Sequence, residues 1–159
     1  MEWRRMRRFN QLMTDAECIG VLRAERRGVL AMNGENGCPY AVPINFYYEP
    51  ERNRIYFHGA REGLKVDLLR SNDKVCLTVF DQGVIPEGEW AYRVASVVIR
   101  GRAQIVTDET EAERAVHQLG LKYYPTAESV AQAMHRSFSK VQVYALTVDH
   151  MTGKRVKEA

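Results

Sequence analysis

Cysteine is scarce in this chain of 159 residues, and its pattern excludes two kinds of site. The three cysteines, Cys18, Cys38 and Cys76, are an odd number at wide spacings, so they indicate neither a disulfide framework nor a C-x-x-C pair. Together with the four histidines they match no metal-ligand spacing, and we expect no metal site. We expect reduced thiols, with Cys18 and Cys76 in the core and Cys38 in a turn.

Long hydrophobic runs are also missing. No apolar run near the N-terminus has the form of a signal-peptide core, and no stretch approaches the length that spans a membrane, so we expect a cytoplasmic protein without membrane contact. The net charge is only +3, which argues against a general nucleic-acid surface. The basic cluster at positions 4 to 8 is interpreted as a solvated terminus rather than an arm that binds polyanions.

Self-sufficient catalytic motifs are absent as well. The chain contains no G-x-S-x-G, no H-E-x-x-H, no Walker A loop and no G-x-G-x-x-G. If the protein is an enzyme, we therefore expect a bound cofactor to supply the reactive group. Hydrophobic residues make up 45% and charged residues 27%, which is typical of a globular protein, and residues 1–159 are expected to form one domain.

The sequence contains more strand patterns than helix patterns. A capping box at Thr14 starts a first helix, which Gly28 is expected to end. Asn/Gly turn signals between a strand at 29–32 and one from Tyr40 to Tyr48 predict a hairpin. Further strands are expected at 54–58, 75–80, 95–106 (with a bulge at Gly101) and 141–148 (with a turn at 152–154), and helices at about 64–72, 108–124 and 128–137. Six strands with mostly short connections predict a mainly β fold, a small antiparallel barrel decorated by helices.

The segment from Ile55 to Asp67 is the most informative part of the sequence. It is interpreted as a strand that ends in a turn at 58–60 and leads into a helix with Lys65 near its start. Backbone amides, the positive helix end and the ammonium would together bind a phosphate group, and the small residues around Gly59 would admit a flat ligand. An ordinary strand-to-helix connection with a surface lysine remains the equal alternative. His58 could meet such a ligand and titrate near neutral pH, or it could be a structural histidine.

Five segments in order resemble the pyridoxamine 5′-phosphate oxidase-like FMN-binding split barrels of Greek-key type, and within them the nitroimidazole-resistance (Nim) proteins. The segments are GVLAM, PYAVPINFYY, IYFHGAREGLKVDLLRSNDKVCLTV, ASVVIRGRAQIV and HMTGK. The resemblance spans residues 6 to 154, so residues 1–5 are interpreted as a possible N-terminal extension.

The resemblance implies a homodimer with two FMN sites at the subunit interface. By position, the strand backbone at Val42, Pro43, Ile44 and Asn45 would line the flavin ring. The ring edge and the phosphate would be held by Gly59, Ala60, Gly63 and Lys65. Ser96 would reach the flavin bound mainly by the other subunit, and His58 would lie close to the reactive face as the catalytic residue.

The activity that the resemblance implies is an FMN-dependent oxidoreductase acting on a small acceptor such as a nitroaromatic. The paired basic residues that grip substrate phosphate in true pyridoxamine phosphate oxidases have no counterparts here, so vitamin B6 oxidation is not expected. Two alternatives remain open: a non-catalytic flavin-binding or sensing module, and the same barrel holding a deazaflavin, or haem with His58 as axial ligand.

Overall fold

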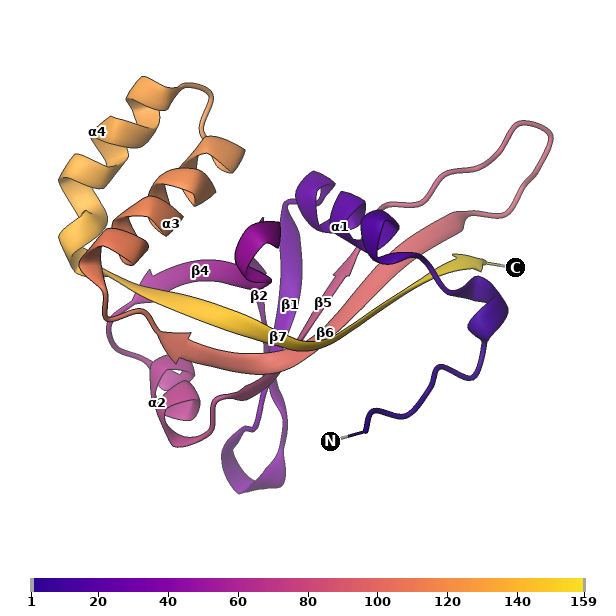
Figure 1. Ribbon diagram of the computed structural model, residues 1–159, viewed down its shortest axis with the longest axis horizontal. Coiled ribbons are helices and arrows are strands. Elements are labelled where there is room, and N and C mark those ends of the chain that lie inside the picture. The colour runs from indigo at the N-terminus through magenta and orange to yellow at the C-terminus, as the bar shows by residue number, and fades with distance from the viewer. Residues whose placement is uncertain (1, 159) are drawn as a thin grey trace.

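The computed structural model describes residues 2–158 and contains one seven-stranded antiparallel sheet with the order β2-β1-β5-β6-β7-β4-β3 (Figure 1). The strands are β1 (Arg27–Met32), β2 (Tyr40–Asn45), β3 (Tyr47–Glu49), β4 (Arg54–Ala60), β5 (Lys74–Phe80), β6 (Arg93–Ile105) and β7 (Val141–Lys157). The helices are α1 (Asp15–Ala24), α2 (Leu64–Ser71), α3 (Glu109–Tyr123) and α4 (Ala127–Ser137), with short 3₁₀ turns η1 (Phe9–Gln11), η2 (Glu35–Gly37), η3 (Pro50–Arg52) and η4 (Phe138–Lys140).

The mainly β barrel expected from the sequence is confirmed, as a sheet that curls until its two edges meet. These edges, β2 and β3, are consecutive in the chain and are separated by Phe46 alone. Phe46 is completely buried, and it divides the single strand that we expected between Tyr40 and Tyr48. The sheet therefore has seven strands instead of six.

Two glycines that we interpreted as a helix end and as part of a turn lie inside strands instead. The first helix ends at Ala24, and Gly28 belongs to β1, where a Cβ atom would lie 2.9 Å from Leu77 Cδ1. The turn expected at 152–154 is also wrong, because β7 continues to Lys157 and Gly153 pairs with Val97. A Cβ at Gly153 would overlap the Cys18 sulfur of α1. Close packing, and not a turn, explains both glycines.

Other local predictions are confirmed. Thr14 and Glu17 form the reciprocal capping box of α1, and Asp108 caps α3 through the Glu111 amide. The β6–β7 register shifts between Arg100 and Gly101, as expected for a bulge. The β1–β2 pair is the expected hairpin, with Asn36 (φ 56°) in its turn.

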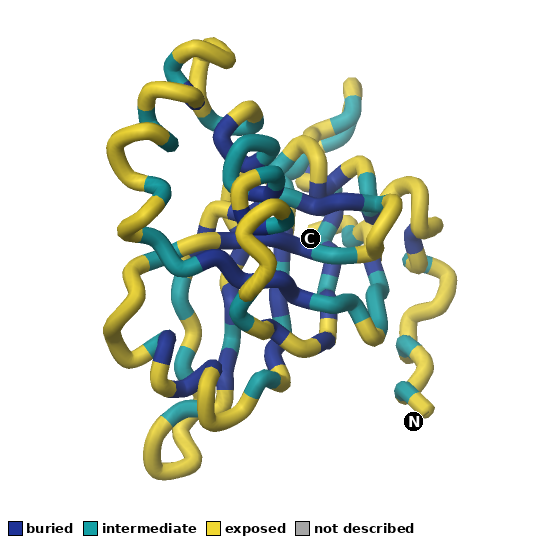
Figure 2. Tube along the Cα trace, turned by 60° about the vertical axis from the view of Figure 1, so that its left-hand side comes forward, coloured by how far each residue is buried: buried dark blue, intermediate teal, exposed yellow. Residues whose placement is uncertain are grey.

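The core fills the inside of the curled sheet, and α1 closes one side of it. Leu22 and Cys18 of α1 are buried among strand residues such as Leu30, Leu77 and Ile99. Figure 2 shows the buried residues concentrated on the strands, while the α3–α4 hairpin is mostly exposed or half-buried. Cys38 is exposed and follows the turn of the β1–β2 hairpin. The expected core position of Cys76 is wrong, because this side chain faces outward from β5 and is half-buried.

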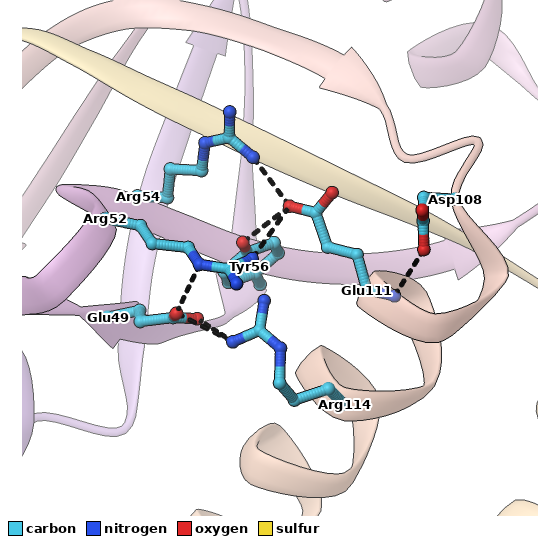
Figure 3. Close-up of polar contacts among 7 residues, drawn as sticks. All are labelled: Glu49, Arg52, Arg54, Tyr56, Asp108, Glu111 and Arg114. Atoms are coloured by element: carbon cyan, nitrogen blue, oxygen red, sulfur yellow. Dashed lines mark hydrogen bonds and ion pairs between the residues drawn. The ribbon is translucent and has the colours of Figure 1, made fainter.

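A cluster of charged side chains fastens α3 to the β3–β4 hairpin (Figure 3). Arg114 Nη1 of α3 lies 2.7 Å from both carboxylate oxygens of Glu49, which is only 5% exposed. Glu111 accepts a hydrogen bond from Tyr56 Oη at 2.7 Å and another from Arg54 Nη1 at 2.6 Å. The helical hairpin is therefore held to the barrel by ion pairs as well as by apolar packing.

The outer face of β2, β1, β5, β6 and β7 carries a row of residues that cross-strand pairing places side by side. The row consists of Pro43, Val29, Thr78, Val98 and Thr152. Val29 is 38% exposed, and Phe80 on the same face is 57% exposed. Exposed apolar side chains such as Val29 and Phe80 on a sheet face are typical of a surface that contacts another molecule.

In the described part of the chain, no helix combines the length and the apolar character needed to cross a membrane. Within residues 2–158, no three His, Cys, Asp or Glu side chains come together in a way that could hold a metal ion.

Candidate functional site

A pocket of about 320 Å³ opens where β1, β2, β4 and α2 meet. Its lining residues come from three separate stretches of the sequence: Arg27, Pro43, Ile44, Asn45, His58 and Lys65. Five of these six are site residues that the sequence analysis singled out. The fold therefore brings the β2 segment and the His58–Lys65 segment to one place.

The local backbone at this pocket differs from the predicted turn. His58, Gly59 and Ala60 are not a turn, because β4 continues through Ala60 and pairs with the first residues of β7. The turn comes later, at Gly63, whose φ of 129° is a conformation that L residues rarely adopt. Gly63 precedes the first residue of α2 and has no capping side chain, so the first amides of α2 remain available as donors.

Lys65 lies folded back against β4. A Cβ atom at Gly59 would be 3.0 Å from Lys65 Nζ, so the absence of a side chain there lets the ammonium approach the strand. The same ammonium lies 5.9 Å from the centre of the Phe57 ring. Burial lowers the pKa of Lys65, because the charged form is partly removed from water.

The charge in the pocket is positive and uncompensated. Among residues 2–158, no carboxylate forms an ion pair with Arg27, His58 or Lys65. Although His58 is exposed in the single chain, the surrounding protein lowers its pKa by desolvation, and the nearby Lys65 charge lowers it further. A group that carries negative charge would relieve this repulsion, so the pocket is suited to an anion such as a phosphate.

The wall opposite Lys65 is the end of β2. Because β2 is an edge strand, one side of its backbone has no strand partner, and Pro43 has no N–H to donate there. Asn45, the last residue of β2, pairs with Arg27 at the start of β1. The backbone of this edge and the Pro43 ring can therefore contact a planar ligand.

The remaining predicted site residues lie outside the lining of this pocket. Ala60 and Gly63 follow His58 towards α2, and the Val42 side chain packs against the core. Ser96 lies on β6, opposite Phe80 and Lys154, and on the outer sheet face rather than in the pocket of its own chain. Sequence reasoning missed Arg27, because it was assigned to the end of the first helix.

A second cavity, of about 130 Å³, lies on the other side of His58 between the α3–α4 hairpin and the start of β7. Its wall is mainly apolar, with the polar groups of Tyr124, Arg136 and Ser137 among its lining residues. Gly120 of α3 lets α4 approach closely, because a Cβ there would lie 2.6 Å from Val130 Cγ1. His58 is thus shared between a cationic pocket and a mostly apolar cavity.

Solved structures with a similar fold cover most of the chain. A candidate 5-nitroimidazole antibiotic resistance protein from Bacteroides thetaiotaomicron is 24% identical, with a TM-score of 0.75 over 92% of this chain and 87% of that one. A conserved hypothetical protein from Mycobacterium tuberculosis is 17% identical, with a TM-score of 0.79 over 94% and 90%. A FAD-binding protein from Mesorhizobium loti is 20% identical, with a TM-score of 0.65 over 92% and 97%.

None of the curated proteins matches the chain. The family model described as pyridoxamine 5′-phosphate oxidase matches residues 14–155. That range includes every strand of the sheet up to β7, both walls of the cationic pocket and both helices of the hairpin beside His58. By its sequence over nearly its full length, and in agreement with its fold, the chain belongs to the pyridoxamine 5′-phosphate oxidase family.

Proposed function

We propose that the protein is an FMN-binding flavoprotein that reduces a small acceptor such as a nitroaromatic compound. The observation that carries this proposal is the pocket that Arg27, His58 and Lys65 line together with the end of the edge strand β2. Within residues 2–158, none of these three side chains forms an ion pair with a carboxylate. A phosphorylated planar cofactor satisfies both features. The names of two similar structures, a FAD-binding protein and a candidate nitroimidazole-resistance protein, support the same direction.

In this proposal the phosphate lies against Lys65 and Arg27, near the free amides at the start of α2. The ring lies along the backbone from Pro43 to Asn45. When bound, FMN supplies hydride or single-electron transfer, which none of the side chains can provide. The residues of the chain bind the cofactor, orient it and exclude water.

His58 is placed to act on the acceptor. The 130 Å³ cavity beside it has a mainly apolar wall, and we assign the acceptor to this side of the imidazole. The imidazole lies at the boundary between the two sites, where it can donate a proton to the acceptor as that molecule gains electrons.

The cofactor site in this proposal is completed by a second copy of the chain. The row on the outer sheet face, which includes Val29 and Val98, is exposed or half-buried in the single chain. Ser96 lies on the same face, next to Lys154. A homodimer formed through this face buries the row and brings the partner's Ser96 towards the flavin.

The first test is a visible absorption spectrum after FMN is added and the protein is desalted. We expect a retained flavin band at about one per chain. Lys65→Met removes one charge-assisted contact, worth about 1.5–3 kcal/mol, and should weaken FMN binding about tenfold or more. The exposed Lys140→Met variant is the control and should bind like the parent protein. A colourless protein that refuses FMN contradicts the proposal, and a Soret band instead favours haem.

The second test is turnover with nicotinamide donors and nitro, quinone or azo acceptors. We expect the rate to fall as the pH rises through the pKa of His58 in the FMN complex, because the proton donor is then lost. His58→Gln should lower turnover, keep FMN bound and abolish that pH dependence, whereas His117→Gln should not. Stoichiometric FMN without acceleration beyond free flavin would indicate a non-catalytic flavin-binding module.

A further inference from the structure

The break between β2 and β3 has unusual backbone partners. Phe46 lies outside both strands and is completely buried, so its N–H and C=O need partners other than a strand ladder. Both partners come from the last turn of α3. The Phe46 N–H donates to Tyr123 Oη at 3.0 Å, and the Phe46 carbonyl accepts a hydrogen bond from Lys122 Nζ at 3.1 Å.

The Tyr123 hydroxyl also holds the neighbouring strand. It donates its single proton to the Arg26 carbonyl at 2.5 Å, while the Arg26 guanidinium lies 5.0 Å from the centre of the Tyr123 ring. The next residue, Arg27, pairs with Asn45, and Asn45 directly precedes Phe46. One hydroxyl thus joins the two paired chain segments that form the β1–β2 wall of the cationic pocket.

The helix that carries Tyr123, α3, also lines the cavity beside His58. The same helix supplies Val116, Leu119 and Gly120 to the cavity on the other side of His58. The ion pairs of Figure 3 fix the beginning of the helix to β3 and β4, and Tyr123 fixes its end. The helix therefore contacts the framework of both sites.

We propose that Tyr123 is a positioning residue that holds the Arg27–Asn45 end of the β1–β2 ladder in place as one wall of the cofactor pocket. This inference rests on the proposed function, because its consequence for FMN requires that FMN bind in that pocket. Tyr123 itself does not line the pocket and touches no reacting atom. Without its hydroxyl, the Phe46 N–H and the Arg26 carbonyl lose their partners, and the end of the β1–β2 ladder loosens.

The test compares Tyr123→Phe with Tyr48→Phe. Tyr48 is a buried tyrosine on β3 whose hydroxyl donates to Asn53 Oδ1 at 3.2 Å, so its variant loses a similar hydrogen bond away from the pocket. Tyr123→Phe leaves the buried Phe46 N–H without its partner. We expect it to weaken FMN binding about tenfold and to alter the absorption and fluorescence of the bound flavin. Tyr48→Phe should lose comparable thermal stability without either effect.

A readout without cofactor separates this proposal from the proposed function. In the apo protein, amide exchange at Phe46 should accelerate about tenfold in Tyr123→Phe and remain unchanged in Tyr48→Phe. If the parent protein binds no FMN, the proposed function is wrong. The exchange rate at Phe46 still shows whether Tyr123 holds the end of the β1–β2 ladder. If the parent binds FMN and Tyr123→Phe matches it in affinity, spectrum and exchange, the positioning role is refuted. If both variants lose the same FMN affinity, the Tyr123 hydroxyl contributes only to overall stability, and the positioning role is refuted.

Discussion

Lys122 offers a test in which the size of the effect follows from the structure. Its ammonium donates to the carbonyls of Leu22 and Phe46 and lies 3.9 Å from the centre of the Phe46 ring. Burial is the main cause that lowers its pKa from 10.5 to about 8, with Glu25 opposing the shift and Arg26 adding to it. A shift of this size corresponds to about 3 kcal/mol for a fully effective site. Because Lys122 is only half-buried, we expect about 1–2 kcal/mol after solvent screening.

The sign follows from proton binding. Between pH 8 and pH 10.5 the unfolded chain holds the Lys122 proton more often than the folded protein does, so this residue increases the free energy of unfolding as the pH rises. Lys122→Met removes that contribution. The difference in unfolding free energy between parent and variant, measured by urea titration from pH 7.5 to 10.5, should therefore move in favour of the parent by about 1–2 kcal/mol.

Taking a difference cancels the titration of cysteines and tyrosines, which both proteins share. The control is Lys140→Met, an exposed lysine, for which the difference should stay constant over the same range. A constant difference for Lys122→Met as well would mean that its ammonium is not desolvated. In that case the Lys122 ammonium does not hold the β2–β3 break through a buried contact with the Phe46 carbonyl.

Three further outcomes test other parts of the structure. Gly153→Ala should lower the free energy of unfolding by about 1–3 kcal/mol, because the added Cβ overlaps the Cys18 sulfur, and Cys18→Ala in the same chain should restore part of the loss in urea titrations. Arg114→Met should cost about 2 kcal/mol by the same assay, since it leaves the buried Glu49 carboxylate with one weaker partner. Val29→Asp should convert a dimer into a folded monomer in light scattering after gel filtration, and a monomeric parent protein would contradict the proposed interface.

Local signals explain which elements could be predicted from the sequence. The capping box of Thr14 and Glu17 needs only four consecutive residues, and the hairpin turn needs only Asn36 and its neighbours. His58 and Lys65 were found together because strand, turn and helix follow one another directly in the chain. In each case, residues close in sequence determine the feature.

Non-local contacts explain the errors. A glycine that forms a turn and a glycine that admits a neighbouring side chain look alike in sequence, and Gly28 is of the second kind because Leu77 packs against it. Arg27 joined the candidate site only when β1 was placed beside β2 and near β4 and α2. The role of Tyr123 depends on Phe46, which lies 77 positions away. No local pattern marks a residue that completes the backbone pairing of a distant strand.

The arrangement of Lys65 and His58 has a consequence for the order of events in the proposed reaction. In the single chain, desolvation lowers the pKa of His58, and the nearby Lys65 ammonium lowers it further. A phosphate beside Lys65 offsets the part of the shift that this ammonium causes, so it raises the pKa of His58 relative to the chain without phosphate. A larger fraction of His58 is therefore protonated, and able to donate to the acceptor, once the cofactor site is filled. Because His58 borders both cavities, one side chain links occupancy of the cationic pocket to proton transfer in the apolar cavity.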